Sequence, residues 1–184
     1  MSDSQISHAN KSANTNVNTK TNSPAPWSWT LRWLGLAGMV IALDQYTKKL
    51  VLQHLPLGGE LEVLPFFSWV YWRNYGAAFS FLNDAGGWQR WGFVALAVGF
   101  SGFLIFELRR LRRVEIAQAL AFALILGGAL GNMLDRAVLG FVVDFAKFHW
   151  GASYFPAFNV ADSAIFLGAA TWFVLIFREM RAGE

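Results

Sequence analysis

Two aspartates, Asp144 and Asp162, stand at the edges of segments that are otherwise apolar enough to lie in a membrane. A charged side chain near hydrocarbon is costly unless it is paired or lines a wet cavity, so each is a functional candidate. When two carboxylates lie close together, one keeps a proton while the other stays charged. The charged one can take a proton from a water that attacks a carbonyl, and the protonated one can polarise the carbonyl oxygen and protonate the leaving amine. Such a pair could hydrolyse a peptide bond.

Other hydrolytic chemistries lack their residues in this chain. There is no cysteine, which excludes a thiolate nucleophile and a Cys-ligated metal. The sequence contains no His-Glu-x-x-His helix, no Gly-x-Ser-x-Gly turn and no Gly-rich phosphate loop. Ser163 lacks a plausible base partner, and His149 has no second ligand at metal spacing. We therefore expect neither a metal nor another cofactor.

Four polar residues near the ends of two apolar segments fall on shared helical faces. Asn132 and Arg136 are four residues apart, so they lie on one face of their helix. Asn159 and Asp162 are three residues apart and also share a face. With its segment running inward, Asp162 lies about one helical turn, roughly 5 Å, beneath the outer surface. The two faces meet at one depth and could form a common site.

Asp44 and Lys48 form an i, i+4 pair in the outer half of the first apolar segment. They could neutralise each other, and Lys48 could extend outward to water. The pair is either a structural ion pair or a support for the site, and the sequence leaves both interpretations open. Asp135, beside Arg136, is interpreted as a helix-end or loop contact rather than as a catalytic group.

The composition places the chain in a membrane. Of its residues 55% are hydrophobic and 16% aromatic, and the mean hydropathy is positive. Four apolar segments have the roughly 20-residue length that crosses a bilayer. They run over Trp33 to about Leu52, Trp91 to Leu108, Val114 to Leu134, and Phe158 to Phe177. We expect an all-α membrane fold of four transmembrane helices.

Arginines determine the predicted orientation. Short loops rich in Lys and Arg stay on the cytoplasmic side. Four arginines crowd the connection between the second and third segments: Arg109, Arg110, Arg112 and Arg113. That connection and both termini are therefore predicted to be cytoplasmic, and the other two connections to face outward. The net charge of +3 is a topology signal and not evidence for a nucleic-acid partner.

The chain divides into a tail and one folded domain. Residues 1–26 are a polar tract that cannot bury enough apolar surface to fold alone, so we expect a disordered cytoplasmic tail. The tract does not resemble a cleavable signal peptide, because the first apolar run begins only after it. Residues 27–184 form the predicted transmembrane domain, with an outer segment over about 54–90 and an outer loop over about 135–157.

The first outer segment predicts a small sheet. Leu61 to Tyr75 mixes β-branched and aromatic residues with partial alternation, which favours short strands with a break at Pro65. Its aromatic residues are typical of headgroup depth, so we expect the sheet to lie on the outer leaflet. The run Asn74-Tyr75-Gly76-Ala77-Ala78-Phe79 is either a turn that needs glycine or a place where Asn74 holds a peptide backbone.

Read together, these patterns resemble one known family. The motifs are Asp44-Gln45-x-x-Lys48, Asn74-x-Gly76-Ala77-Ala78-Phe79, Gly127-Gly128-Ala129-x-Gly131-Asn132-x-x-Asp135-Arg136, Val142-Val143-Asp144-Phe145, and Phe158-Asn159-x-Ala161-Asp162. In this order they are similar to the motifs of bacterial lipoprotein signal peptidases, also called signal peptidase II. The resemblance extends from about Leu31 to Arg178 and leaves the polar tail unassigned.

The resemblance implies an aspartyl endopeptidase of the bacterial inner membrane. Such an enzyme cleaves the signal peptide from prolipoproteins just before a cysteine that carries a diacylglyceryl group. Its partners would be lipidated prolipoproteins and membrane lipids, and we expect a monomer. The implied roles are as follows: a catalytic dyad of Asp144 and Asp162, substrate or carboxylate positioning by Asn132, Arg136 and Asn159, binding of the substrate chain by Asn74 and Gly76, and support by Asp44 and Lys48.

The resemblance also implies a fold and a geometry for the reaction. The fold would be a four-helix bundle topped by a small extracytoplasmic β-cradle and an interfacial helix, with Trp88 to Trp91 at the interface. A lipid-modified cysteine would present the scissile bond at the depth of Asp144 and Asp162. The lipid anchor would supply binding energy remote from that bond.

Two other classes of function fit parts of the pattern. A proton-coupled transporter could use Asp44, Asp144 and Asp162 as a relay, but it would spread acidic groups through the depth of the membrane. A non-catalytic scaffold subunit would give two carboxylates no reason to converge. The gathering of polar residues near one leaflet favours the peptidase.

Overall fold

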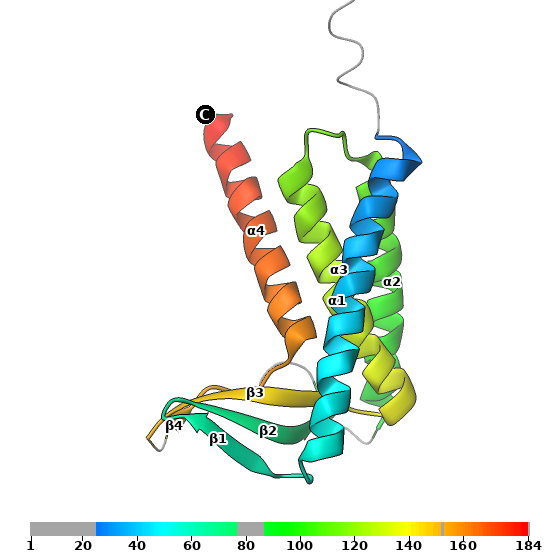
Figure 1. Ribbon diagram of the computed structural model, residues 1–184. Coiled ribbons are helices and arrows are strands. Elements are labelled where there is room, and N and C mark those ends of the chain that lie inside the picture. The colour runs from blue at the N-terminus through cyan, green and yellow to red at the C-terminus, as the bar shows by residue number, and fades with distance from the viewer. Residues whose placement is uncertain (1–24, 77–86, 152, 184) are drawn as a thin grey trace, which may run out of the picture.

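The computed structural model describes residues 25–76, 87–151 and 153–183, and within them four helices stand on a small sheet (Figure 1). The elements in chain order are α1 (Trp27–His54), β1 (Glu60–Leu64), β2 (Phe67–Asn74), α2 (Trp88–Arg110), α3 (Ile116–Leu139), β3 (Val142–Trp150), β4 (Ser153–Tyr154) and α4 (Val160–Ala182). The sheet lies at one end of the helices, and α4 ends at the opposite end (Figure 1).

Three of the helices are long and apolar enough to cross a membrane by length and composition: α2, α3 and α4. This confirms the predicted membrane character. Helix α1 is 28 residues long, but polar residues in its second half lower its hydropathy. Two of them, Asp44 and Lys48, are buried against neighbouring elements.

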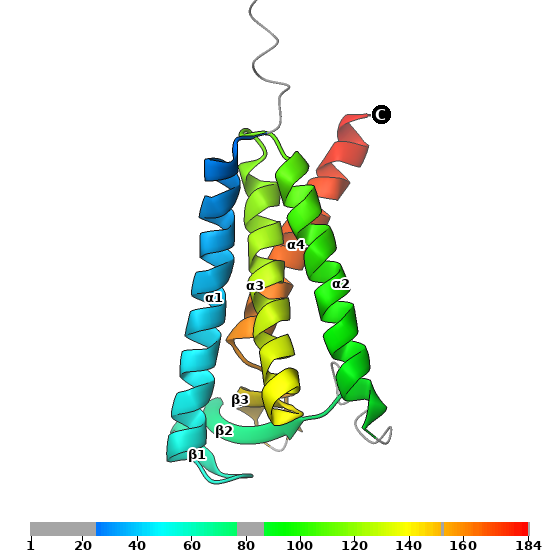
Figure 2. The same ribbon diagram turned by 90° about the vertical axis from the view of Figure 1, so that its right-hand side faces the viewer.

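Helix α3 is the centre of the bundle, because it packs against each of the other three helices (Figure 2). Its small residues allow this closeness. A Cβ on Gly127 would meet Ala37 of α1, and a Cβ on Gly128 would overlap the carbonyl oxygen of Ala161 in α4. The backbones of α3 and α4 are therefore in contact near the start of α4.

The sheet is antiparallel with the order β1-β2-β3-β4. Strands β1 and β2 confirm the strands predicted within Leu61 to Tyr75, and Pro65 lies in the turn between them. Strand β3 was not predicted, since its residues were interpreted as part of an outer loop. It pairs with β2 over six residue pairs, among them Trp72 with Asp144. The Val142-Val143-Asp144-Phe145 run has the β-branched and aromatic residues that would have indicated a strand.

The end of α3 also differs from its predicted position. The helix continues to Leu139, five residues past the predicted Leu134, so that Asp135 lies inside the helix rather than in a loop. Gly140 then ends the helix in a left-handed conformation with φ of 89°, as glycine does at many helix C-termini. This turn leads the chain directly into β3.

Several predicted features lie at or beyond the edges of the described residues. Trp88 to Trp91 form the first turn of α2, and the described ranges contain no separate interfacial helix. Residues 1–24 of the predicted tail and Ala77–Phe79 of the outer motif lie outside the described residues. Ala25, which the prediction placed within the tail of residues 1–26, is buried and donates its amide to the Leu111 carbonyl at 3.0 Å.

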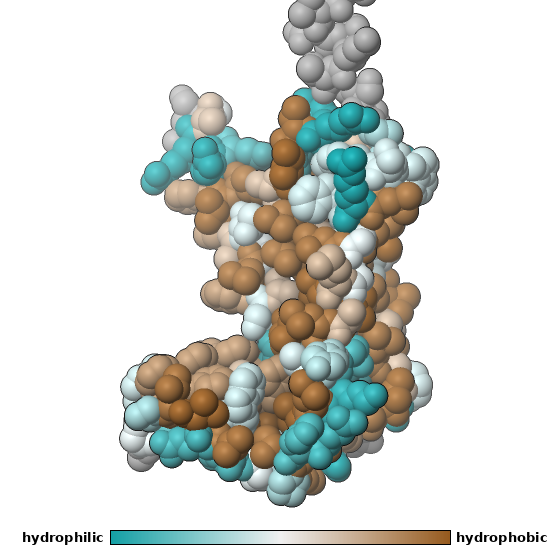
Figure 3. Space-filling view, viewed as in Figure 1, coloured by the Kyte–Doolittle hydropathy of each residue, from teal (hydrophilic) through white to brown (hydrophobic). Residues whose placement is uncertain are grey.

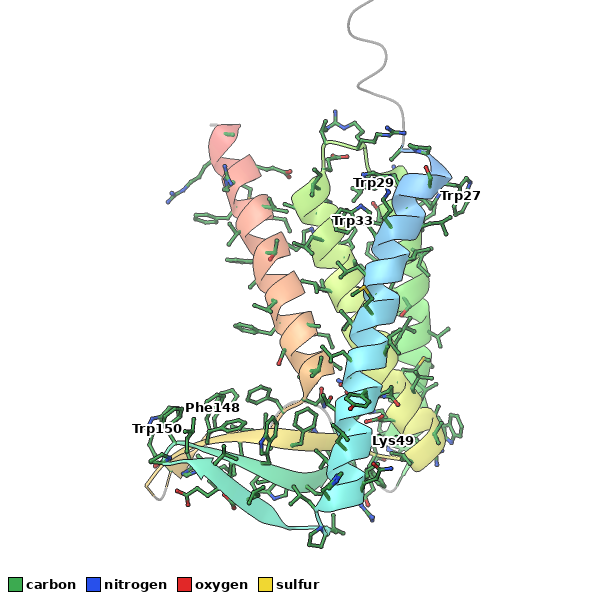
Figure 4. All side chains as sticks on the ribbon, in the orientation of Figure 1. Trp27, Trp29, Trp33, Lys49, Phe148 and Trp150 are labelled. Carbon is green, nitrogen blue, oxygen red and sulfur yellow. The ribbon has the colours of Figure 1, made fainter. Side chains whose placement is uncertain are left out.

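Aromatic and apolar side chains mark two levels of the molecule. Apolar residues cover the middle of the helices, with hydrophilic residues concentrated toward both ends (Figure 3). Trp27, Trp29 and Trp33 lie at the end of the bundle away from the sheet, and Phe148 and Trp150 lie at the far edge of the sheet (Figure 4). Tryptophan at both levels is typical of the two interfaces of a membrane protein.

Candidate active site

Asp144 comes from strand β3, where pairing with β2 holds its backbone opposite Trp72. Its side chain is 5% exposed. Asn159 Nδ2 donates to Asp144 Oδ1 at 2.8 Å, and Asn74 Nδ2 donates to Asp144 Oδ2 at 3.1 Å. Both donors are neutral amides, so the carboxyl is bonded without being neutralised by a cation.

Asp162 lies in the first turn of α4 and closes its N-terminal cap. The Asp162 amide donates to Asn159 Oδ1 at 2.9 Å, and the Asn159 amide donates to Asp162 Oδ2 at 3.2 Å. This reciprocal pair is a capping box. Asn132 Nδ2 of α3 donates to the other oxygen, Asp162 Oδ1, at 2.7 Å. The carboxylate is thus fixed by its own helix and by α3.

Asn159 connects the two aspartates. Its side-chain amide nitrogen bonds Asp144, while its side-chain oxygen and backbone amide bond Asp162. The same nitrogen also reaches the Val143 carbonyl and Asn132 Oδ1, both at 3.3 Å. The structure therefore connects the carboxylates of β3 and α4 through one shared residue.

Burial and charge change the acidity of Asp144. Desolvation, and after it the charge of Asp162, raise the pKa of Asp144 from its ordinary 3.8 to about 7, against the opposing hydrogen bonds from Asn74 and Asn159. At neutral pH this carboxyl consequently holds its proton for much of the time. A proton available next to a second carboxylate is what an acid–base pair requires.

A cleft of about 1130 Å³ opens beside the two carboxylates. One end is polar and contains Asn74, Asn132, Arg136, Asp144 and Asp162. The rest is mostly apolar and is lined by residues of α4 and of the segment before it, among them Phe155, Phe158, Ile165, Phe166 and Leu167. The hollow between the projecting sheet and the helices is visible in Figure 3. The cleft can hold an extended polar chain at one end and apolar groups along the other.

Arg136 and Asn74 both hold Gly76. Arg136 Nη2 donates to the Gly76 carbonyl at 2.6 Å, and the Gly76 amide donates to Asn74 Oδ1 at 3.0 Å. Arg136 Nη1 also reaches the Asn132 carbonyl at 3.4 Å, in agreement with their predicted shared face. The guanidinium lies over the ring of Phe93 at 4.8 Å from its centroid. Gly76 is thereby anchored by two residues that line the cleft.

Lys48 does not extend outward to water, contrary to the prediction from its position. It is 2% exposed, and its ammonium bonds Asp44 at 2.7 Å, Asp135 at 2.9 Å and Asn132 at 2.9 Å. The predicted Asp44–Lys48 ion pair is confirmed. Asp44 Oδ1 also accepts from the Ala161 amide at 2.9 Å, directly before Asp162. Because protein acceptors replace water around the ammonium, the Lys48 side chain stays in the interior.

Asp135 and Gln45 were not assigned to the site from the sequence. Asp135 accepts from Gln45 Nε2 at 2.8 Å and from the Val143 amide at 3.1 Å, in addition to Lys48. It therefore joins α1, α3 and the strand that carries Asp144. The sequence signal that could have revealed Asp135 is Lys48, a charged residue in the first apolar segment, because a charge in such a segment needs a partner from a neighbouring one. Within the described residues, no three His, Asp or Glu side chains are grouped to hold a metal ion.

Comparison with known proteins identifies a family and relatives of this chain. A family model described as Signal peptidase (SPase) II matches residues 36–178. Proteins named lipoprotein signal peptidase from Shewanella oneidensis and Shewanella woodyi are 53% and 54% identical over 139 and 140 residues. The alignments cover 76% of this chain and 82% and 80% of those relatives.

Solved structures share the fold. Two of them, each described as a bacterial membrane enzyme, match with TM-scores of 0.76 and 0.69 at 25% and 26% identity. The matches cover 89% and 84% of this chain and 96% of each solved chain. The family resemblance predicted from the motifs is confirmed, and the chain belongs to the signal peptidase II family of aspartic proteases that act in lipoprotein processing at membranes.

Proposed function

We propose that this protein is the endopeptidase that removes signal peptides from prolipoproteins whose cysteine carries a diacylglyceryl group, cleaving just before that cysteine. The observation that carries the proposal is the joining of Asp144 and Asp162 through Asn159 at the polar end of a large cleft. The names of the relatives support lipoproteins as the substrate class.

In the proposed reaction the two aspartates share one proton. One carboxylate takes a proton from a water molecule as that water attacks the scissile carbonyl. Asp144, which at a pKa of about 7 still holds a proton in a large share of the molecules near neutrality, donates a hydrogen bond to the carbonyl oxygen. It then gives a proton to the leaving amine, which is the amino group of the lipidated cysteine. The bond from carbon to nitrogen breaks, and the signal peptide leaves as a carboxylic acid.

The other polar residues of the cleft position the substrate or the dyad. Asn132 and Asn159 orient the carboxylates through the hydrogen bonds described above. Arg136 and Asn74, which line the cleft, hold Gly76, and we assign binding of the substrate chain to Asn74 and Gly76. The apolar part of the cleft, along Phe166 and Leu167, receives lipid chains or the signal helix. Contacts remote from the bond can thus contribute to catalysis.

All four helices cross the bacterial inner membrane in this proposal. Helix α1, the least apolar, has 28 residues and so a length of about 42 Å at 1.5 Å per residue, which is enough to span. Its Asp44 and Lys48 face protein rather than lipid. Both termini and the arginine-rich α2–α3 connection lie in the cytoplasm, and the sheet lies at the outer leaflet. A monomer is part of this proposal.

A cleavage assay tests the proposal. The purified protein in lipid is given a lipidated precursor, and in parallel the same precursor without the diacylglyceryl group. We expect the lipidated precursor to be cut before the cysteine and the other at least about 100-fold more slowly, because remote binding energy is used at the reacting bond. Mass spectrometry of both products checks the position of the cut. Equal cleavage of the two precursors, or a cut elsewhere, would contradict the proposal.

A further inference from the structure

The ammonium of Lys48 uses all of its hydrogen-bonding capacity inside the protein. A lysine ammonium has three N–H donors. Three acceptors lie within 2.9 Å of Nζ: Asp44 Oδ2, Asp135 Oδ2 and Asn132 Oδ1. Two of these are carboxylates that hold the cation in place, and the third is the side-chain oxygen of a residue that bonds Asp162. Of these three hydrogen-bond partners of Lys48, Asn132 is the one whose side chain bonds Asp162 directly.

This cluster needs an explanation other than stability. Lys48 is 2% exposed, Asp44 is fully buried, and Asp135 is 3% exposed. Removing such charges from water costs several kcal/mol per ion, so buried ion pairs often stabilise a fold no better than apolar side chains of the same size. A buried cation beside a pair of titrating carboxylates can instead determine where the charge of that pair lies.

Asn132 transmits the position of the cation to Asp162. Its Oδ1 accepts from Lys48 at 2.9 Å and from Asn159 at 3.3 Å, while its Nδ2 donates to Asp162 Oδ1 at 2.7 Å. Turning the amide over would place its NH₂ group against the ammonium. The amide orientation is therefore locked, and its polarisation by the cation strengthens the bond that it donates.

The surroundings of the two aspartates are unequal. Asp162 receives the polarised Asn132 amide and lies at the N-terminus of α4, where the helix dipole favours negative charge. Asp144 receives only the neutral amides of Asn74 and Asn159. The charged groups that face the pair are Lys48 and Asp44 from α1 and Asp135 and Arg136 from α3. Within the described part of the chain, Arg136 forms no ion pair with either aspartate.

We propose that Lys48 is a positioning residue that acts through Asn132 to keep Asp162 as the charged, water-activating member of the dyad, so that Asp144 carries the shared proton. This inference rests on the proposed function. Asp44 and Asp135 contribute by holding the ammonium against Asn132, at a place where it cannot move into the dyad and bind either aspartate directly.

A pH–rate profile tests the inference. Lys48→Met removes the cation, and Lys49→Met removes a lysine one residue away that is exposed at the sheet end of α1 (Figure 4). We expect kcat of Lys48→Met to fall at least about 10-fold with little change in KM, since base catalysis is lost rather than binding. The acid limb should move up by about one pH unit, because Asp162 without the polarised donor keeps its proton to higher pH. Lys49→Met should match the unaltered protein.

A second variant covers the possibility that Lys48→Met does not fold. Asn132→Ala leaves Lys48 paired with Asp44 and Asp135, and it removes the donor to Asp162 together with the oxygen that accepts from Lys48 and Asn159. It should move the acid limb in the same direction, and the double variant Lys48→Met/Asn132→Ala should move it no further. A purely structural role would lower the amount of active protein and leave the limb in place. An unchanged acid limb in a folded Lys48→Met protein overturns the inference, and so does an unchanged acid limb in Asn132→Ala.

A titration without substrate separates the inference from the proposed function. Infrared difference spectra follow the carboxyl group of Asp162 in an Asp144→Asn background, with and without Lys48→Met. The protonation midpoint should rise when Lys48 is replaced, whether or not the protein cleaves prolipoproteins. An unchanged midpoint overturns the inference. Failure of the unaltered protein to cleave the lipidated precursor would instead overturn the proposed function.

Discussion

Asn159 donates a 2.8 Å hydrogen bond to Asp144 and is also the N-cap residue of the helix that carries Asp162. The residue that begins α4 therefore also fixes the distance from α4 to strand β3. Any change in the packing of this helix against the sheet is transmitted to both carboxylates. The fold and the chemistry are coupled at this residue.

The first prediction concerns the dyad. Asp144→Asn and Asp162→Asn should each lower processing of a lipidated precursor by on the order of 10² to 10⁴-fold, because each removes an acid or a base from the reaction. Both proteins should still accumulate in the membrane, and immunoblotting of membranes and of precursor checks both statements. Glu62→Gln, an exposed carboxylate on β1, is the control and should process normally. Normal processing by either dyad variant would count decisively against the pair.

The second prediction separates the two functions of Asn159. Asn159→Ser keeps an N-cap oxygen but cannot donate to Asp144, whereas Asn159→Ala loses both. The Ala variant should be less stable than the Ser variant by roughly 1 kcal/mol, the usual contribution of a cap. Both should lose most of their activity because Asp144 is no longer held. Thermal unfolding and cleavage rates are measured side by side, and a Ser variant with full activity would show that capping alone matters.

The third prediction follows from the acidity of Asp144. Burial raises its pKa to about 7, whereas in the unfolded chain the carboxyl ionises near 3.8. Between these values the folded state binds more protons, so this residue's contribution to stability is complete below about pH 4 and is lost as the pH rises to about 7. Relative to the unaltered protein, Asp144→Asn should therefore gain in Tm between pH 5 and pH 8. Parallel changes of Tm in the two proteins would contradict the assignment.

The fourth prediction is that Asp135 acts mainly on stability. Asp135→Ala leaves Lys48 and the Val143 amide each without one buried partner, and breaking such a pair costs about 3–5 kcal/mol. Glu107→Ala removes a more exposed pair with Arg110 and should cost less than about 1 kcal/mol. Denaturation in detergent compares the two. A fully folded but inactive Asp135→Asn protein would contradict this prediction, because it would show that Asp135 acts mainly on the reaction rather than on stability.

The fifth prediction concerns the packing of α3 against α4. Gly128→Ala would place a methyl group on the Ala161 carbonyl, next to Asp162, and should reduce both stability and cleavage. Gly102→Ala on α2 meets nothing within 4 Å and should be neutral or slightly stabilising, since alanine favours a helix by about 1 kcal/mol over glycine in water. Thermal unfolding and cleavage assays are run on both. Equal effects of the two substitutions would contradict the close approach at Gly128.

Much of this protein could be predicted from its sequence because the signals are local. Apolar segments of sufficient length indicate a membrane protein, and α2, α3 and α4 confirm three of the four predicted spans by length and composition. Alternation with aromatic residues predicted β1 and β2. The family was identified from short motifs in one order, and the comparisons confirm it. Each of these signals is contained within a few turns or one strand of chain.

Features that depend on distant partners were missed or left open. The residue types of β3 favour a strand, but its partner β2 lies about 70 residues earlier in the chain, and no local pattern identifies that partner. The prediction that Lys48 extends outward to water was wrong, because Asp135, 87 positions later in the chain, forms an ion pair with its ammonium inside the protein.

The sequence by itself determined the membrane class, the family and the residues able to do acid–base chemistry, because composition and short motifs encode them directly. Only the tertiary structure decided that Asn159 joins Asp144 to Asp162 and that Lys48 reaches the pair through Asn132. Those relationships arise where α1, α3, β3 and α4 pack together, and packing is a property of the whole chain rather than of any one segment.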